Sequence, residues 1–326
     1  SYETYRELEV GDTMNQLQSK QVSTEKPWLL VLMIDSSHSM QADWGASRKS
    51  MSIIVEEAIN QLLYDMALNY IVDDSTKEDQ STKDRIHLKI IIYSGEDTHD
   101  PLMSESNHAY SLASGPGGWV GNYETLYQYS DENNTLEIPR WVKLEPSGKT
   151  PMLLAFQTAK KSVKKHIEDY PSSFPPVVLN ISDGEPTDCG DPVNWEILKN
   201  EAEEIKSFGE EGQNPLICNI HLDPLGRSPP STYSHKPPVL GKVEAGLWHL
   251  SSIIPDYIID QIPILKDNNR KGSERLFVFN SNIVHFHEFL DFATRRNTLN
   301  ISKKPICTVD IEKSSKYIDV EFSEEE

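Results

Sequence analysis

Residues 28–34 read WLLVLMI and are followed at once by the polar residues DSSHS, 35–39. Seven consecutive apolar residues are too few for an independent helix and are typical of a strand buried on both faces, as in the centre of a parallel sheet. In open sheets of this kind, ligands bind beyond the carboxyl ends of the strands. This stretch therefore predicts a buried central strand and a polar site directly after it.

Helical and strand patterns alternate along the rest of the chain. Apolar residues recur at helical spacing over 48–70, 151–167, 193–208 and 282–295. Short apolar runs predict further strands at 86–93, 177–181, 216–222 and 276–279. This alternation is typical of βαβ units. It predicts an α/β fold with a doubly wound, mostly parallel sheet that carries helices on both faces.

The length of 326 residues fits one large domain with extensions or two smaller domains. We expect an N-terminal extension at 1–26, one domain at 27–297, and a C-terminal extension at 298–326 that forms a hairpin before an acidic end. Two stretches rich in Ser, Gly, Pro or Tyr, at about 96–140 and 223–246, predict long loops inside the domain.

The composition narrows the class of partner. The chain holds 31 Lys and Arg against 51 Asp and Glu, a net charge of −20 that opposes nucleic acid as the main partner. Its longest apolar run is far shorter than the ~20 residues that span a bilayer. The three cysteines form no CxxC pair, so neither a disulfide framework nor a zinc cluster is expected. We expect a soluble cytoplasmic protein that binds neither nucleic acid nor membrane.

Oxygen-bearing side chains lie next to three of the predicted elements. Asp35, Ser37 and Ser39 follow the first strand, Thr150 precedes the helix at 151–167, and Asp183 follows the strand at 177–181. In a doubly wound sheet these positions meet at one edge. Carboxylates and hydroxyls are hard ligands that suit Mg²⁺. A Ser-rich cap for the helix that follows the first strand is the alternative.

In these residues the chain resembles the von Willebrand factor type A (VWA) family. Within that family it is similar to the bacterial intracellular members of the TerY type. The metal-ion-dependent adhesion site of that family consists of Asp-x-Ser-x-Ser, a distant Thr and a distant Asp. Its residues match Asp35, Ser37, Ser39, Thr150 and Asp183 here. The resemblance implies that the three hydroxyls coordinate Mg²⁺, or Mn²⁺ in its place. It also implies that the two carboxylates bind directly or through water.

The resemblance further implies a protein-binding module in which a carboxylate of the partner completes the metal shell. The expected setting is a bacterial stress-response or defence complex, with AAA ATPases, kinases or phosphatases as precedents for the partner. In the family, binding can be coupled to movement of the last helix, here 282–295. One rival is a metal-dependent phosphoesterase, which would need a general base or a second metal. The other is a structural subunit whose metal only stabilises the fold. We expect no enzymatic activity.

Several residues near the predicted site have more ordinary interpretations. Asp188 either supports the metal ligands or caps the helix that begins near 193. Cys189 lacks an evident base to activate it as a nucleophile. Trp44 and the stretch 115–119 either contact a partner beside the metal or pack as ordinary loop residues.

Overall fold

The structure is a computed structural model of the whole chain. It describes residues 25–44, 48–70, 86–99, 110–111, 126–131, 134–223, 231–238, 241–259 and 272–279. The predicted helix at 282–295, the C-terminal extension at 298–326, residues 115–119 and nearly all of the N-terminal extension lie outside these ranges.

Within the described ranges, eight strands form one mixed sheet, in the order β3-β2-β1-β7-β8-β10-β9 with β4 also paired to β2. The parallel strands are β1 (Trp28–Asp35), β2 (Ile86–Ser94), β7 (Val177–Ser182), β8 (Leu216–His221) and β10 (Phe277–Phe279). The antiparallel strands are β3 (Asp97–His99), β4 (Tyr110–Ser111) and β9 (Ser231–Thr232). The predicted α/β fold with a doubly wound, mostly parallel sheet is confirmed.

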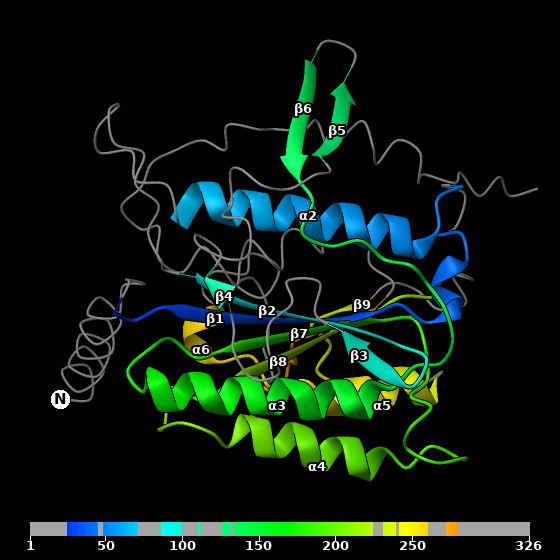
Figure 1. Cartoon of the computed structure of the whole chain (residues 1–326). Coiled ribbons are helices and arrows are strands. Elements are labelled where there is room, and N and C mark those ends of the chain that lie inside the picture. Colours follow the sequence, from blue (N-terminus) through cyan, green and yellow to red (C-terminus); the bar gives the residue numbers. More distant parts are fainter. Residues whose placement is uncertain are drawn as a thin grey trace, which may run out of the picture.

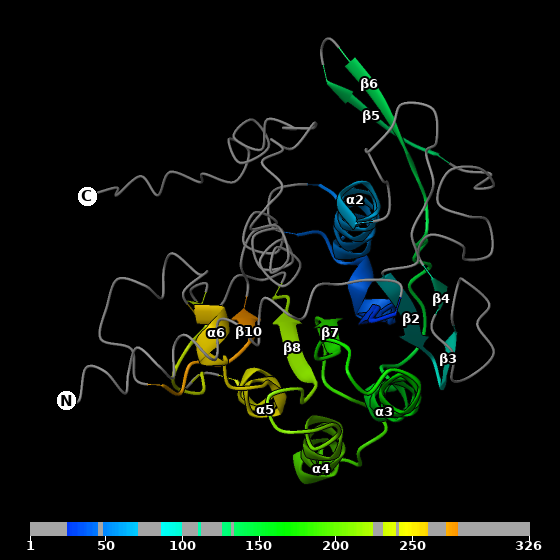
Figure 2. The ribbon, with the colours of Figure 1, turned by 90° about the vertical axis from the view of Figure 1, so that its left-hand side faces the viewer.

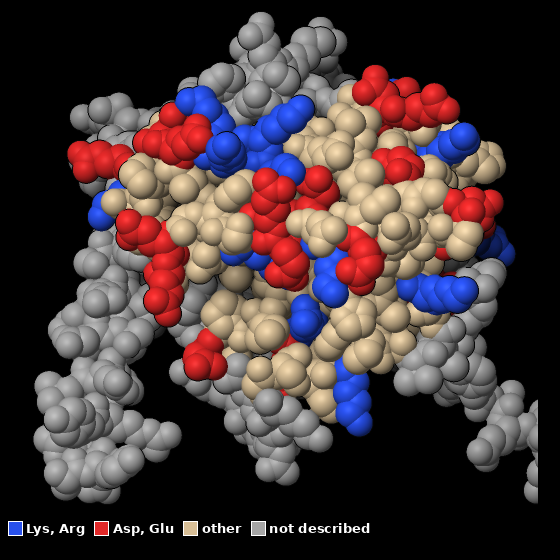
Figure 3. All heavy atoms as spheres, turned by 90° about the horizontal axis from the view of Figure 1, so that it is seen from below, with Lys and Arg blue, Asp and Glu red and all other residues tan. Residues whose placement is uncertain are grey.

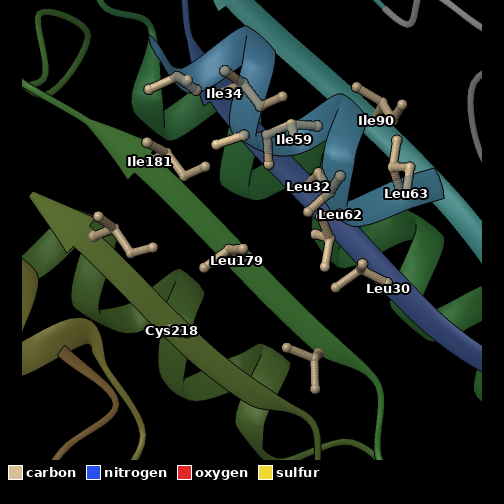
Figure 4. Close-up of a cluster of buried hydrophobic side chains, with 14 of the residues drawn as sticks. Leu30, Leu32, Ile34, Ile59, Leu62, Leu63, Ile90, Leu179, Ile181 and Cys218 are labelled. Carbon is tan, nitrogen blue, oxygen red and sulfur yellow. The ribbon is translucent and has the colours of Figure 1, made fainter. Parts of the chain in front are cut away.

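Strand β1 lies in the middle of the sheet, and all its residues are buried. Leu30 pairs with Leu88 of β2 on one side and with Val177 of β7 on the other. Alternate residues of β1 enter two separate cores, one on each face. Figure 4 shows Leu30, Leu32 and Ile34 packed beneath a helix in one of these cores. An unbroken apolar run is required here because neither face of the strand reaches water.

Helices cover both faces of the sheet (Figures 1 and 2). Helix α2 (Met51–Tyr70) lies on one face, and α3 (Met152–Asp169), α4 (Trp195–Lys206) and α5 (Lys242–Leu250) lie on the other. The short helices are η1 (His38–Gln41) and α6 (Asp256–Ile259). Of the helices in the described ranges, none has the length and hydrophobicity needed to cross a membrane.

The surface seen from below in Figure 3 carries interspersed charges of both signs. On α3, Lys160 pairs with Glu201 and Glu204 of α4, at 2.7 and 2.8 Å. On α4 itself, Lys206 pairs with Glu203 at 2.6 Å. Lys160 and Glu201 are only partly exposed, and the two pairs of Lys160 link α3 to α4, whereas the pair of Lys206 lies within α4.

The stretch 96–140 contains more secondary structure than the predicted loop. Besides β3 and β4, it holds an antiparallel hairpin of β5 (Leu126–Asp131) and β6 (Asn134–Pro139), which stands apart from the sheet on the side of α2 (Figure 1). The prediction of a loop was wrong here, because its Ser, Tyr and Asn residues are equally compatible with a polar hairpin.

The segment after the hairpin is held by side chains of α2. Asn60 accepts hydrogen bonds from the backbone N–H groups of Trp141 and Val142, at 2.7 and 2.9 Å, and donates to the Val142 carbonyl at 2.8 Å. Glu56 accepts from the N–H of Leu144 at 2.7 Å and pairs with Arg140. These two side chains replace the partner strand that a buried extended segment needs. The segment is thereby fixed as it runs toward Thr150.

The predicted loop at 223–246 ends earlier than expected, because residues 242–250 form helix α5. Gly246 lowers the helix propensity in the middle of this stretch, which hides the helix from sequence reasoning. The glycine is required by packing, because a Cβ atom at 246 would overlap the indole ring of Trp195 on α4.

We expect Gly246→Ala to destabilise the protein by about 1–3 kcal/mol, because overlap in a packed contact outweighs the gain in helix propensity. Urea denaturation followed by circular dichroism measures this change. In a Trp195→Ala background the ring is absent, so the same substitution should cost nothing further. An equal loss in both backgrounds would contradict the packing explanation.

Candidate metal centre

The site lies where the direction of winding changes. From β1 the chain adds β2 on one side, and it later adds β7, β8 and β10 on the other. The connections after β1 and after β7 lead to helices on opposite faces, α2 and α4, so they diverge at the carboxyl ends of these two strands. Open α/β sheets bind their ligands at such a position. Asp35 ends β1, and Asp183 follows the last residue of β7.

The carboxylate of Asp35 is fully buried at this end of the sheet. One oxygen, Oδ1, accepts a hydrogen bond from the backbone N–H of Ser37 at 2.8 Å. The other, Oδ2, accepts from the hydroxyl of Ser182 at 2.7 Å. The short turn after β1 and the end of β7 are therefore joined through a single side chain.

The two predicted serine ligands lie on the turn that follows Asp35. Ser37 stands at the N-terminus of η1, and its Oγ lies 3.0 Å from the Oγ of Ser39. The Ser39 hydroxyl donates to Asp183 Oδ1 at 2.8 Å, across 144 positions of sequence. Met40 anchors the turn because its side chain is buried in the core beneath α2. Sequence-distant oxygens thus meet as predicted.

Thr150 reaches the site on a loop that is hydrogen-bonded to the first motif. The N–H of Ser147 donates to the Ser36 carbonyl at 2.9 Å, and the N–H of His38 donates to the Gly148 carbonyl at 3.1 Å. Gly148 has a φ of +64°, and a Cβ atom there would lie 2.6 Å from the Cα of Gly95. Glycine is needed at this position for both reasons.

The loop that carries Asp183 also holds Thr150 and the start of α3. Thr187 accepts from the N–H of Thr150 at 3.1 Å through Oγ1 and donates its own N–H to the Thr150 carbonyl at 2.9 Å. The carboxylate of Asp188 accepts from the N–H groups of Leu153 and Leu154, at 3.1 and 3.0 Å.

Asp188 therefore caps α3, which precedes it in the sequence. Of its two predicted roles, the cap of the following helix is not found, because α4 is capped by Asn194, which accepts from the N–H of Glu196 at 3.2 Å. Spacing along the chain suggests a local cap, whereas the contact to α3 exists only in the folded protein. The other predicted role, support of the metal ligands, stays a prediction.

Three of the predicted ligands lie near Gly184. A Cβ atom built on this glycine would lie 3.5 Å from Thr150 Oγ1, 3.8 Å from Ser39 Oγ and 3.9 Å from Asp35 Oδ2. Neighbouring oxygens around an octahedral Mg²⁺ are about 2.9 Å apart, given metal–oxygen distances of 2.0–2.1 Å. The separations from Ser39 Oγ to Ser37 Oγ and to Asp183 Oδ1, 3.0 and 2.8 Å, match this edge length. The donor set fits a small divalent cation.

The electrostatics of the candidate site also favour a cation. Burial raises the pKa of Asp35 to about 7, and the nearby charge of Asp183 adds to this shift. Burial likewise raises the pKa of Asp183 above its usual range. Two close carboxylates in a poorly solvated place repel each other, and a divalent ion relieves both the repulsion and the loss of hydration.

The arrangement differs from sites built on nitrogen, sulfur and carboxylate ligands. In the part of the chain that the structure describes, no three His, Cys, Asp or Glu residues are grouped in a way that could hold a metal ion. The candidate site contains only two such residues, because the other three predicted ligands are hydroxyls.

The surroundings of two further residues near the site, Cys189 and Trp44, favour structural roles for them. Burial, and then the charge of Asp188, raise the pKa of the Cys189 thiol to about 12, so the thiol is protonated at neutral pH. Trp44 is partly buried and packs against the core beneath α2. This is the loop packing that the sequence left as one of two interpretations.

Comparisons with known proteins leave the family open. No family model matches the chain, and no curated protein matches it. Three of its structural neighbours have low similarity. The manganese-loaded TRAP protein of Plasmodium vivax has 13% identity and a TM-score of 0.33, over 65% of this chain and 67% of that one.

The other two neighbours are bacterial pilus proteins. They are the pilus adhesin SpaC of Lactobacillus rhamnosus GG (11% identity, TM-score 0.42) and the minor pilin PilB of Streptococcus sanguinis (11%, 0.39). The alignments cover 86% and 84% of this chain, but only 32% of SpaC and 61% of PilB. At these scores the neighbours carry no argument about function.

We expect metal affinity to fall as the pH is lowered through about 7. Because the pKa of Asp35 is raised to about 7, a bound proton must leave before the carboxylate can take part in binding a cation. Below this pH the affinity should weaken by about tenfold per pH unit. Titration calorimetry with Mn²⁺ between about pH 8 and about pH 5.5 measures this, with circular dichroism to verify folding. A constant affinity over this range would contradict the prediction.

Proposed function

We propose that the chain is a Mg²⁺-dependent protein-binding module, with Mn²⁺ able to take the same place. Asp35, Ser37, Ser39, Thr150 and Asp183 would hold the cation, and a carboxylate of a protein partner would complete its coordination. The observation that carries this proposal is the meeting of hydroxyl and carboxylate oxygens from three separate segments near Gly184.

The accessibility of the ligands supports an open coordination position. Asp35, Ser37 and Thr150 are buried, whereas Ser39 is exposed and Asp183 is partly exposed. A cation at the candidate site would therefore be enclosed on the side of the buried ligands and reachable from the side of Ser39 and Asp183. With three neutral hydroxyls in the shell, such a cation keeps enough positive charge to attract a partner's Asp or Glu.

The local chemistry favours binding over catalysis. The Asp188 carboxylate is engaged with the first turn of α3, and the Cys189 thiol is protonated at neutral pH. Neither is thus prepared to act as a general base or a nucleophile beside the metal. We propose accordingly that the module is not an enzyme.

We propose a cytoplasmic bacterial stress-response or defence complex, whose partner is an AAA ATPase, a kinase or a phosphatase component. This setting rests only on the resemblance of the motif residues to bacterial intracellular, TerY-type members of the VWA family. The three neighbours named above are a pilus adhesin, a minor pilin and a Plasmodium protein, so they give it no support.

The hydroxyl of Thr150 provides a direct test of the metal site. Thr150→Val keeps the shape of the side chain but removes the oxygen, and we expect Mn²⁺ affinity to fall by about tenfold or more. Thr150→Ser keeps the oxygen and should bind within a few-fold of the unaltered chain. Titration calorimetry with Mn²⁺ measures both variants. Equal affinities for the valine and serine variants would remove Thr150 from the ligand set.

The metal dependence of partner binding is tested by affinity capture from lysate of the native host, with and without excess EDTA. We expect Asp35→Ala and EDTA to abolish capture of the same partner, and Thr150→Ser to retain it. Capture that persists in EDTA while the melting temperature falls would indicate a metal that only stabilises the fold. Hydrolysis of phosphoesters in the presence of Mg²⁺ or Mn²⁺ would favour the enzymatic alternative instead.

A further inference from the structure

A chain of hydrogen bonds crosses the buried sheet face that supports α3 and α5. The hydroxyl of Tyr93 on β2 donates to Asn180 Oδ1 on β7 at 2.8 Å. The Nδ2 of Asn180 donates to Asn219 Oδ1 on β8 at 3.0 Å. The Nδ2 of Asn219 then donates to the Ser251 hydroxyl, which caps the C-terminus of α5, at 2.9 Å. We call these four residues the polar ladder.

The polar ladder is placed where apolar residues would be expected. All four side chains are fully buried, and their neighbours on this face include Phe156, Ile217 and Phe277. Burial, and then the charge of Asp35, raise the pKa of Tyr93 well above its ordinary value, so the phenol remains a donor. A polar chain in such a core is tolerated only when each member has its partner, and the bonds then allow only one arrangement of the strands.

Each of the three segments that carry predicted metal ligands touches the polar ladder. Tyr93 is the register partner of Asp35, and its carbonyl accepts from the N–H of Ser36 at 2.9 Å. Asn180 also donates to the sulfur of Met152, at 3.8 Å, in the turn of α3 that follows Thr150. On β7, Asn180 lies three residues before Asp183.

The ladder bond nearest the site joins two strands that are not neighbours. Strand β1 lies between β2 and β7 in the sheet (Figure 2). The side chain of Tyr93 on β2 therefore reaches past β1 to meet Asn180 on β7. This contact ties together the strands on both sides of Asp35. A relative shift of β2 and β7 would break the Tyr93–Asn180 bond, and it would move Asp183 away from Ser39.

We propose that the polar ladder of Tyr93, Asn180, Asn219 and Ser251 positions the three ligand-bearing segments, so that the metal affinity of the site depends on it. Tyr93 and Asn180 are positioning residues that touch neither the cation nor the partner. This inference rests on the proposed metal site and adds to it the residues that set the spacing of the ligands. Groups of this supporting kind change metal affinity by about 10- to 100-fold when they are removed.

The test compares two variants that each remove one buried hydrogen bond. Tyr93→Phe deletes the hydroxyl that donates to Asn180 and leaves the ring in place. The matched control, Trp28→Phe, removes the indole N–H that donates to the Pro175 carbonyl at 3.1 Å, at the opposite end of β1. Mn²⁺ binding is measured by titration calorimetry well below the melting temperature of each variant.

We expect Tyr93→Phe to weaken Mn²⁺ binding by about tenfold or more and Trp28→Phe to change it by less than about twofold, even where both lower the melting temperature. Equal affinities of the two variants, alongside normal binding by the unaltered chain, would overturn the polar ladder and leave the proposed function standing. Absence of Mn²⁺ binding by the unaltered chain would overturn both.

Ser251→Ala serves as the second variant, should Tyr93→Phe not fold. It removes the hydroxyl that accepts from Asn219, at the end of the polar ladder most distant from the site. We expect Mn²⁺ affinity to fall several-fold, because the Asn219 amide loses one of its fixed acceptors and the position of β8 against β7 loosens. An affinity equal to that of the unaltered chain would overturn the inference.

Discussion

The structure of the candidate metal site depends on the burial of one carboxylate. Asp35 is cut off from water, and its two oxygens are engaged by Ser37 from the turn after β1 and by Ser182 from β7. These bonds join the two strands at their carboxyl ends, while burial and the nearby charge of Asp183 raise the pKa of the Asp35 carboxyl to about 7. A buried negative charge of this kind is costly unless a cation or a proton joins it. The site is therefore built to attract one.

The supports of the site come from both faces of the sheet. On one face, Asn60 and Glu56 of α2 hold the segment that leads to Thr150. On the other face, Asp188 holds the first turn of α3, directly after Thr150. The chain is therefore held on both sides of Thr150, so that its hydroxyl approaches the candidate site in a defined direction. Such preorganisation lowers the entropy lost when a ligand is bound.

Local sequence patterns were sufficient for the parallel strands, because continuous apolar runs carry their own signal. The oxygens of Ser39 and Asp183, predicted from separate motifs, lie together in the structure, and their role as metal ligands stays a prediction. They were insufficient where a residue's partner lies far away in the chain. Gly246 hid helix α5, since its fit against Trp195 exists only after folding. Asn180 and Asn219 lie inside separate strands, and only the register of β7 with β8 brings them together. The contact of Asp188 with α3 likewise exists only after folding.

The span from Asp183 to Asp188 serves two neighbours at once, since one end faces Ser39 and the other holds α3. Because both ends are anchored, inserting or deleting a single residue would pull one of them out of place. Side chains at exposed positions such as Glu185 can therefore be exchanged, whereas a change in the length of this connection would disturb either Asp183 or the start of α3. Of these two kinds of change, the fold tolerates only the first in this connection.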